Sequence, residues 1–216
     1  MSYRKITKLR YNKMAPNKLL RIFSYLFHPL FISVYAVWVF FVFGESYFEY
    51  RQIYLIIIQI VIITIFIPIT FYYLLLSLGK VDTIMLADKA QRKLPLLIHA
   101  VLLLILIKKS ITTEHFPQLH YFFAASLIST ILALIMVLAG FKVSLHMIGI
   151  TALTVFTIGI SLHFHTRMIS LIVPLVVVNG FVASSRLEMK AHTVSELIWG
   201  SCIGTIPQIV LLYIWL

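Results

Sequence analysis

The chain carries little charge. Only 12% of its 216 residues are charged, against roughly 25% in a typical soluble domain, and 61% are hydrophobic. A soluble core of this size has no room for so many apolar side chains, whereas a bilayer requires about 20 of them for each helical span. The composition therefore excludes an ordinary soluble domain and predicts one integral membrane domain.

The chain is also poor in cysteine and in linker sequence. Its single cysteine, Cys202, excludes an intrachain disulfide. There is no internal repeat and no Pro/Gly-rich linker. Residues 20–43 are too long for the hydrophobic core of a cleavable signal, and no small-residue cleavage site follows them. We therefore expect this first apolar segment to remain in the protein as a helix.

Seven apolar runs follow the N-terminus. They cover residues 20–43, 53–78, 94–107, 121–139, 147–162, 168–183 and 194–216. Several are rich in β-branched residues, which favour strands in water, but in lipid a helix satisfies every backbone group internally. We predict an all-α, polytopic transmembrane bundle of six to seven helices, with a basic cytoplasmic tail at 1–18 and one transmembrane domain at 19–216. The third, fifth and sixth runs reach spanning length only with polar flanks at the interface.

The basic residues are distributed unevenly between the two ends of the predicted helices. The N-terminal tail holds seven of the eighteen, and the loops on the same side of a seven-helix topology hold seven more. Only Arg51, Lys108, Lys109 and Arg167 lie on the other side. Because Lys and Arg in short loops stay cytoplasmic, we expect the tail and three polar loops in the cytoplasm and the C-terminus outside.

These three polar loops are residues 79–95, 140–149 and 184–200. Each begins or ends a predicted helix, so their side chains can converge without entering hydrocarbon, where an unpaired charge costs at least ~2.5 kcal/mol. Such convergence would surround His146 and His192 with Arg92, Arg186 and neighbouring lysines. This pattern of charge suits an anion.

The third loop has a spacing that suggests chemistry. If a helix begins near Ser185, His192 and Glu196 lie four residues apart on one face, and the carboxylate can hold one ring nitrogen. That contact fixes the tautomer and leaves the other nitrogen as a nucleophile. His146 begins another predicted helix and could protonate a leaving oxygen. Helix N-termini also supply N–H donors for phosphate oxygens.

The same residues resemble a signature of the type 2 phosphatidate phosphatase and vanadium haloperoxidase superfamily. Ser185, Arg186, His192 and Glu196 match the third signature of this family, SR-x5-H-x3-D, with glutamate in place of the usual aspartate. The match covers four positions at the family's spacing. It is the strongest part of the resemblance.

The other two signatures are weaker. Ser144 and His146 match two positions of the family's PSGH signature, whereas its Pro and Gly are replaced. Of the first signature, K-x6-RP, only Arg92 and Pro95 are present, and two residues separate them. The order of the three signatures agrees with the family. Its membrane members typically have three helices before the first signature and none between the first and second, whereas this sequence predicts two and two.

The resemblance implies a lipid phosphatase that needs no metal and no cofactor. His192 would attack phosphorus and form a phosphohistidine, Glu196 would orient it, and His146 would protonate the leaving alcohol and later activate water. The remaining residues implied to hold the phosphoryl oxygens are Arg92, Ser144, Ser185, Arg186, Lys89 and Lys93. The implied partners are a lipid phosphate substrate and membrane lipids, without nucleic acid. We expect the protein in a bacterial inner membrane, with a cytoplasmic site.

The identity of the lipid is left open by the sequence. A cytoplasmic site favours phosphatidate or phosphatidylglycerol phosphate, and an outer site favours a polyprenyl diphosphate or lipid A. The remaining histidines are interpreted as structural hydrogen-bonding residues. They are His28, His99, His115, His120, His163 and His165.

Two other classes of function remain as alternatives. A non-catalytic lipid-phosphate carrier would use the same basic pocket to bind a headgroup without cleaving it. A magnesium-dependent intramembrane prenyltransferase is suggested by Asp82 and Asp88, but that family needs a second aspartate-rich motif and this chain has no third aspartate.

Overall fold

The computed structural model describes residues 18–44, 48–80 and 90–216. These residues form helices and no strand. The α-helices are α1 (Lys18–Leu26), α2 (Pro29–Phe43), α3 (Tyr50–Val61), α4 (Ile67–Ser77), α5 (Lys93–Lys109), α6 (Pro117–Leu138), α7 (Leu145–His163), α8 (Ile169–Glu188) and α9 (Val194–Trp215). A π-helical segment, Ile62–Phe66, joins α3 to α4, and a 3₁₀ turn, Ala90–Arg92, precedes α5. The predicted all-α bundle is confirmed.

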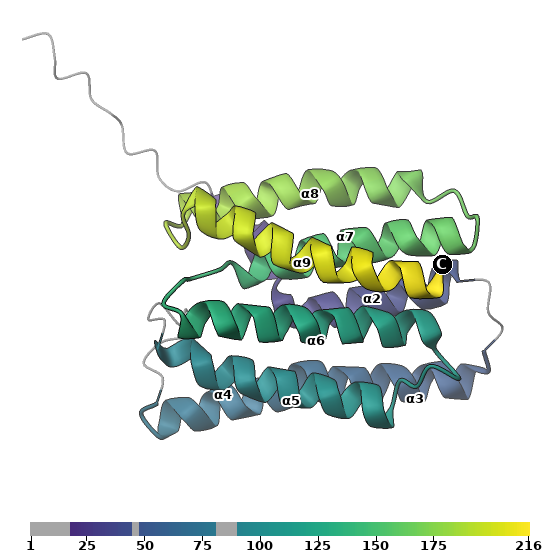
Figure 1. The fold of residues 1–216 in the computed structure, drawn as a ribbon, viewed down its shortest axis with the longest axis horizontal. Coiled ribbons are helices and arrows are strands. Elements are labelled where there is room, and N and C mark those ends of the chain that lie inside the picture. The colour runs from purple at the N-terminus through teal and green to yellow at the C-terminus, as the bar shows by residue number, and fades with distance from the viewer. Residues whose placement is uncertain (1–17, 45–47, 81–89) are drawn as a thin grey trace, which may run out of the picture.

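The helices lie roughly parallel to one axis, so that their ends gather at two faces (Figure 1). Five continuous helices are long and apolar enough to cross a membrane: Tyr50–Ser77, Pro117–Leu138, Leu145–His163, Ile169–Glu188 and Val194–Trp215. A sixth span arises if α1 and α2, which are bent by 68°, count as one. The β-branched runs are therefore helical.

The α5 helix corresponds to the short third run. Its 17 residues reach about 25 Å at 1.5 Å per residue, slightly less than the ~30 Å hydrocarbon core. It nevertheless runs beside α6 along the bundle (Figure 1). The fifth and sixth runs do gain length from their flanks, since α7 has 19 residues and α8 has 20.

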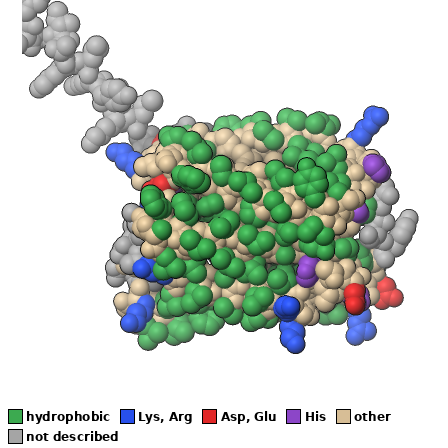
Figure 2. Space-filling model, viewed as in Figure 1, with side chains coloured by type: hydrophobic (Ala, Val, Ile, Leu, Met, Phe, Trp, Pro, Cys, Tyr) green, Lys and Arg blue, Asp and Glu red, His purple; other side chains and the backbone are tan. Residues whose placement is uncertain are grey.

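The outer surface is suited to lipid. Hydrophobic side chains cover the middle of the face in Figure 2, and its charged side chains lie mostly toward the ends of the bundle. Large apolar side chains on α6, α8 and α9 are about half exposed, for example Ile135 at 53%, Val176 at 56% and Ile198 at 57%. Exposed apolar surface on this scale is unfavourable in water and favourable against acyl chains. The protein is therefore a membrane protein.

A close contact between α7 and α9 holds the starts of these two helices together. Gly200 and Gly204 are spaced as in a G-x-x-x-G pattern on α9, which lets two helix backbones approach. A Cβ on Gly200 would meet the Ser144 backbone oxygen, and one on Gly204 would meet the backbone of Ile148. The first turns of α7 and α9 are therefore held side by side, which brings the second and third signatures together.

Candidate active site

The described parts of the three polar loops, residues 79–80 with 90–95, 140–149 and 184–200, lie at one end of the bundle. At this end, on the left in Figure 1, lie the start of α7, the end of α8 and the start of α9. We call the residues that meet there the basic cluster. It comprises Ser24, His28, Arg92, Lys142, Ser144, His146, Ser185, Arg186, His192 and Glu196.

His192 and Glu196 form the predicted pair. The His192 Nδ1–H group donates to Glu196 Oε2 over 2.7 Å. The imidazole is almost completely buried, at 2% exposure of its side chain, whereas the carboxylate remains 22% exposed. Because Glu196 holds Nδ1, the lone pair of the neutral ring lies on Nε2. A neutral ring held in this way can act as a nucleophile through Nε2.

The route to this contact differs from the prediction. No helix begins near Ser185; instead α8 continues to Glu188, and α9 begins at Val194. Lys190 adopts a positive φ of 52°, and the Lys190 and Ala191 N–H groups donate to the carbonyls of the last helical turn. This is a Schellman ending, which reverses the chain, so His192 lies in a turn rather than on a helix.

The capping box of α9 explains the glutamate at position 196. Thr193 Oγ1 accepts from the Glu196 N–H, and Glu196 Oε2 accepts from the Thr193 N–H, both at 3.3 Å. The same Oε2 atom accepts from His192. A capping box uses the length of glutamate or glutamine at this position. Glutamate can therefore cap the helix and orient the histidine, two roles that the shorter aspartate side chain would not combine in this way.

The surroundings of His192 keep it neutral. The pKa of His192 is lowered from 6.5 to about 4, mainly by burial and also by the positive charges of Lys142, Arg186 and Arg92, although the hydrogen bond to Glu196 raises it. Burial and cationic neighbours thus outweigh the carboxylate. At neutral pH the ring carries no proton on Nε2 and can attack an electrophile.

Two arginines face this histidine from different helices. Arg92 is 7% exposed, and its Nη1 donates to the Val143 carbonyl over 3.4 Å. Burial lowers the pKa of Arg92, and the charge of Glu196 raises it. Arg186 lies close enough to Arg92 for the two charges to repel. Among the described residues, the buried Nε of Arg186 has no hydrogen-bond partner.

The arrangement of these two arginines favours an anion between them. Leaving a buried charged donor unpaired is costly, and two neighbouring guanidinium groups repel unless negative charge compensates them. Glu196 supplies one negative charge. A phosphate or similar anion would satisfy the remaining donors in the fork geometry that arginine favours.

Ser144 joins the two histidine signatures. Its Oγ accepts from the Met147 N–H and caps α7, and its own N–H donates to the Glu196 carbonyl over 3.2 Å. Its side chain is completely buried. Ser144 thereby fixes the start of α7 against the start of α9.

Ser185 is buried beside α1 rather than open to a ligand. Its Oγ shares a hydrogen bond of 2.7 Å with Ser24 Oγ, and Phe23 stacks on Phe181 with ring centroids 4.6 Å apart. These contacts attach α1 to the end of α8. Ser185 is thus a packing residue between two helices in this structure, although the sequence resemblance implies a phosphate contact.

His146 meets the N-terminal segment. Its Nε2 lies 3.1 Å from the Ser24 backbone oxygen, and since a carbonyl only accepts, Nε2 carries the proton. The His28 ring lies against it, with centroids 5.1 Å apart, and His28 Nδ1 accepts from the Leu30 N–H at the start of α2. Sequence reasoning missed Ser24 and His28. The signal that could have found them is the presence of a serine and a histidine close together in an otherwise apolar segment.

The lysines of the polar loops differ in their position relative to the basic cluster. Lys89 lies outside the described residues. Lys93 is exposed on the first turn of α5, and no described contact joins it to the basic cluster. Lys142 does join it, because its Nζ donates to the Ala191 carbonyl over 2.6 Å and its charge acts on His192. The sequence argument used Lys142 only for topology.

The histidines at the opposite end have packing contacts. His163 Nε2 accepts from the Gln118 amide over 2.9 Å, and His120 Nδ1 bonds the Ile111 carbonyl over 2.7 Å. Within residues 18–44, 48–80 and 90–216, no three His, Cys, Asp or Glu side chains are grouped so that they could hold a metal ion.

Comparison with protein families, with curated proteins and with solved structures finds no match to this chain.

Proposed function

We propose that this protein is a membrane lipid phosphatase that hydrolyses a phosphomonoester or diphosphate headgroup through a phosphohistidine. The observation that carries the proposal is the His192–Glu196 pair, buried beside Arg92 and Arg186 at the membrane face. The match of four residues to the third family signature supports it.

The chemistry follows from the geometry of the basic cluster. The Nε2 lone pair of His192 attacks phosphorus while the bond from phosphorus to the lipid oxygen breaks. His146, protonated on both ring nitrogens, gives one proton to that oxygen as it leaves and becomes neutral, with its Nε2–H still bonded to the Ser24 carbonyl. Water then attacks the phosphohistidine, His146 takes its proton, and inorganic phosphate is released with His192 restored. Arg92, Arg186 and the N-terminus of α7 stabilise the charge on the phosphoryl oxygens.

The basic tail supports a site on the cytoplasmic face of a bacterial inner membrane. Helix α1 packs against the end of α8 at the basic cluster, and the C-terminus lies at the other end (Figure 1). Positive residues near helix ends favour the cytoplasm. We therefore propose a substrate from the inner leaflet.

The direct test is phosphate release from lipid phosphates by the purified protein in EDTA, with and without vanadate. We expect release in EDTA, because the mechanism uses no metal. We also expect inhibition by vanadate, which adopts the five-coordinate geometry of the transition state. A strict requirement for magnesium would favour the prenyltransferase alternative. Binding of the lipid without release would favour a carrier.

The pH dependence should report the environment of His192. The nucleophile must be neutral, and its pKa is lowered from 6.5 to about 4, so kcat/KM should stay high below pH 6.5 and decline only near pH 4. The Lys142→Met variant removes a charge that lowers this pKa, so its acidic limb should lie at higher pH. An acidic limb near pH 6.5 in the wild type, unmoved in Lys142→Met, would contradict the assignment.

A further inference from the structure

A cavity of about 90 Å³ lies between α2, α5, α6 and α7. Its walls continue directly from the basic cluster. Leu96 lies one helical turn after Arg92, and Leu145 directly precedes His146. The cavity therefore begins where the phosphate site ends, on the side toward the middle of the bundle. The part of a lipid that is attached to its phosphate would reach this position.

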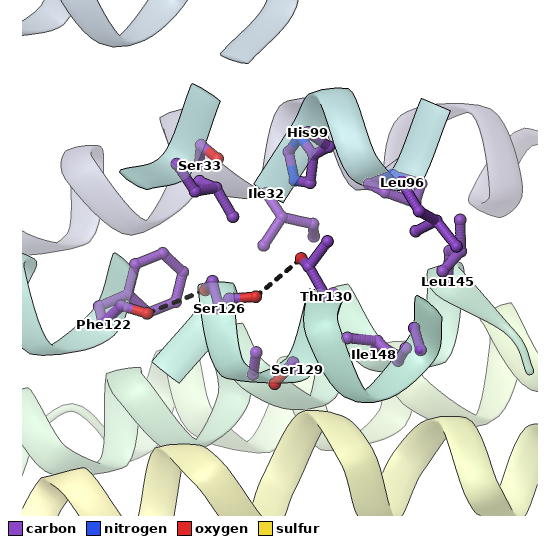
Figure 3. Close-up of a pocket in the computed structure, with 15 residues that line it drawn as sticks. Ile32, Ser33, Leu96, His99, Phe122, Ser126, Ser129, Thr130, Leu145 and Ile148 are labelled. Atoms are coloured by element: carbon purple, nitrogen blue, oxygen red, sulfur yellow. Dashed lines mark hydrogen bonds between the residues drawn. The ribbon is translucent and has the colours of Figure 1, made fainter. Parts of the chain in front are cut away.

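The cavity has polar groups on two walls. Figure 3 shows His99 and Ser33 on one side of it and Ser126 and Thr130 on the other. Ser126 Oγ donates to the Phe122 carbonyl over 2.9 Å, and Thr130 Oγ1 donates to the Ser126 carbonyl over 2.8 Å. Each of these hydroxyl groups has used its proton within its own helix. Their oxygens can act only as acceptors toward the cavity.

His99 and Ser33 differ from Ser126 and Thr130 on the opposite wall in their hydrogen bonding. The part of the chain that the structure describes gives neither side chain a hydrogen-bond partner. A neutral imidazole has one donor and one acceptor, and a hydroxyl group has one donor. In apolar surroundings an unpaired polar group is costly, and acyl chains cannot pair it. The wall formed by α2 and α5 therefore offers two hydrogen-bond donors, which a ligand with an acceptor oxygen would pair.

We propose that this cavity binds the glycerol ester region of a glycerolipid phosphate, with His99 and Ser33 donating to an ester carbonyl. This inference rests on the proposed phosphatase function and names its substrate class. His99 follows Arg92 by seven residues, which corresponds to about 10 Å along a helix. The side chain of Arg92 spans part of this distance, so the phosphate that it binds would lie less than about 10 Å from His99. In a glycerolipid the ester carbonyls lie a few bonds from the phosphorus.

A polyprenyl phosphate fits this wall less well. At the same depth it presents only methyl groups and double bonds, which would leave His99 and Ser33 unpaired. The cavity, of about 90 Å³, has room for a small group such as an ester linkage. The acyl chains would continue along the lipid-facing surface of the helices.

The test compares three substrates with the purified protein: a diacyl phosphatidate, the dialkyl ether of the same chain length, and a polyprenyl phosphate. The ether has the same headgroup and lacks only the carbonyls. We expect kcat/KM for the ester to exceed that for the ether by several-fold to about tenfold, the range of one neutral hydrogen bond. The polyprenyl phosphate should be the poorest of the three.

The His99→Phe variant retains an aromatic ring and loses both nitrogens. It should bring the rate on the ester down to that on the ether, mainly through KM, and His99→Asn should recover part of the preference. The matched control is His115→Phe, at an exposed position on the opposite end, which should retain the full preference. If His99→Phe fails to fold, Ser33→Ala should show a smaller loss of the same preference.

The possible failures can be told apart. Equal wild-type rates on ester and ether, an equal loss on both in His99→Phe, or faster turnover of the polyprenyl phosphate would overturn the cavity assignment and leave the phosphatase proposal standing. If no lipid phosphate is hydrolysed, the phosphatase proposal is wrong and this inference is wrong with it.

Discussion

His192→Ala should lose phosphate release from every lipid phosphate, by more than about 10⁴-fold, because the covalent step of the proposed mechanism requires the lone pair of His192 Nε2. His192 Nδ1 is held by Glu196 at 2.7 Å, which leaves Nε2 as the attacking atom. His146 has another role in this mechanism, since its Nε2 carries the proton that bonds the Ser24 carbonyl and the ring serves as acid and base. The measurement is single-turnover phosphate release, together with acid-labile labelling of the protein by a substrate with radioactive phosphate.

The protein should still fold in this variant. The capping box that begins α9 uses Thr193 and Glu196 without the imidazole, so the turn keeps its backbone contacts. The control is His115→Ala, which changes an exposed histidine at the opposite end and should retain wild-type labelling. Substantial turnover by a folded His192→Ala protein, or labelling of the same protein at another residue, would refute the phosphohistidine mechanism.

Arg186→Lys should lower kcat/KM by about 10²-fold or more although the charge is conserved, in line with the loss of one preorganised donor group. The Arg186 Nε is buried without a partner among the described residues, so it is available to bond a phosphoryl oxygen together with a terminal nitrogen. Lysine offers one point charge in place of this planar pair. The effect should appear in kcat as well as KM, because the equatorial oxygens gain charge in the transition state.

The matched control is Arg167→Lys. Arg167 is exposed in the connection between α7 and α8, at the end opposite to the basic cluster. Its replacement should leave the kinetics of lipid hydrolysis unchanged. If Arg186→Lys were as active as Arg167→Lys, the guanidinium group would have no bidentate role. Arg186 would then be a headgroup anchor of the kind common at membrane interfaces.

Much of the candidate site was accessible to sequence reasoning because its chemistry is local. His192 and Glu196 are four residues apart, and their contact forms although no helix begins near Ser185. A turn followed by a capping box brings them together as a continuous helix would have done. For the same reason the pairing did not depend on a correct assignment of the boundary of α8.

The role of Ser185 could not be read from its spacing. Whether its hydroxyl group is open to a ligand depends on α1, which is distant in sequence and contacts it through Ser24. Likewise His28 was interpreted as structural, yet it lies beside His146. In both cases a long-range helix contact decided the environment of the side chain, and a local pattern carries no information on such a contact.

Sequence reasoning alone was sufficient to predict an all-α membrane protein with its polar loops at one end of the bundle. Hydrocarbon excludes unpaired backbone and charge, so composition and the position of the apolar runs are sufficient for both conclusions. Only the tertiary structure decided which side chains complete the cluster. The close approach of α7 and α9 at Gly200 and Gly204, the bend between α1 and α2 and the cavity at His99 depend on how helices pack. Packing is determined by shape complementarity between distant segments.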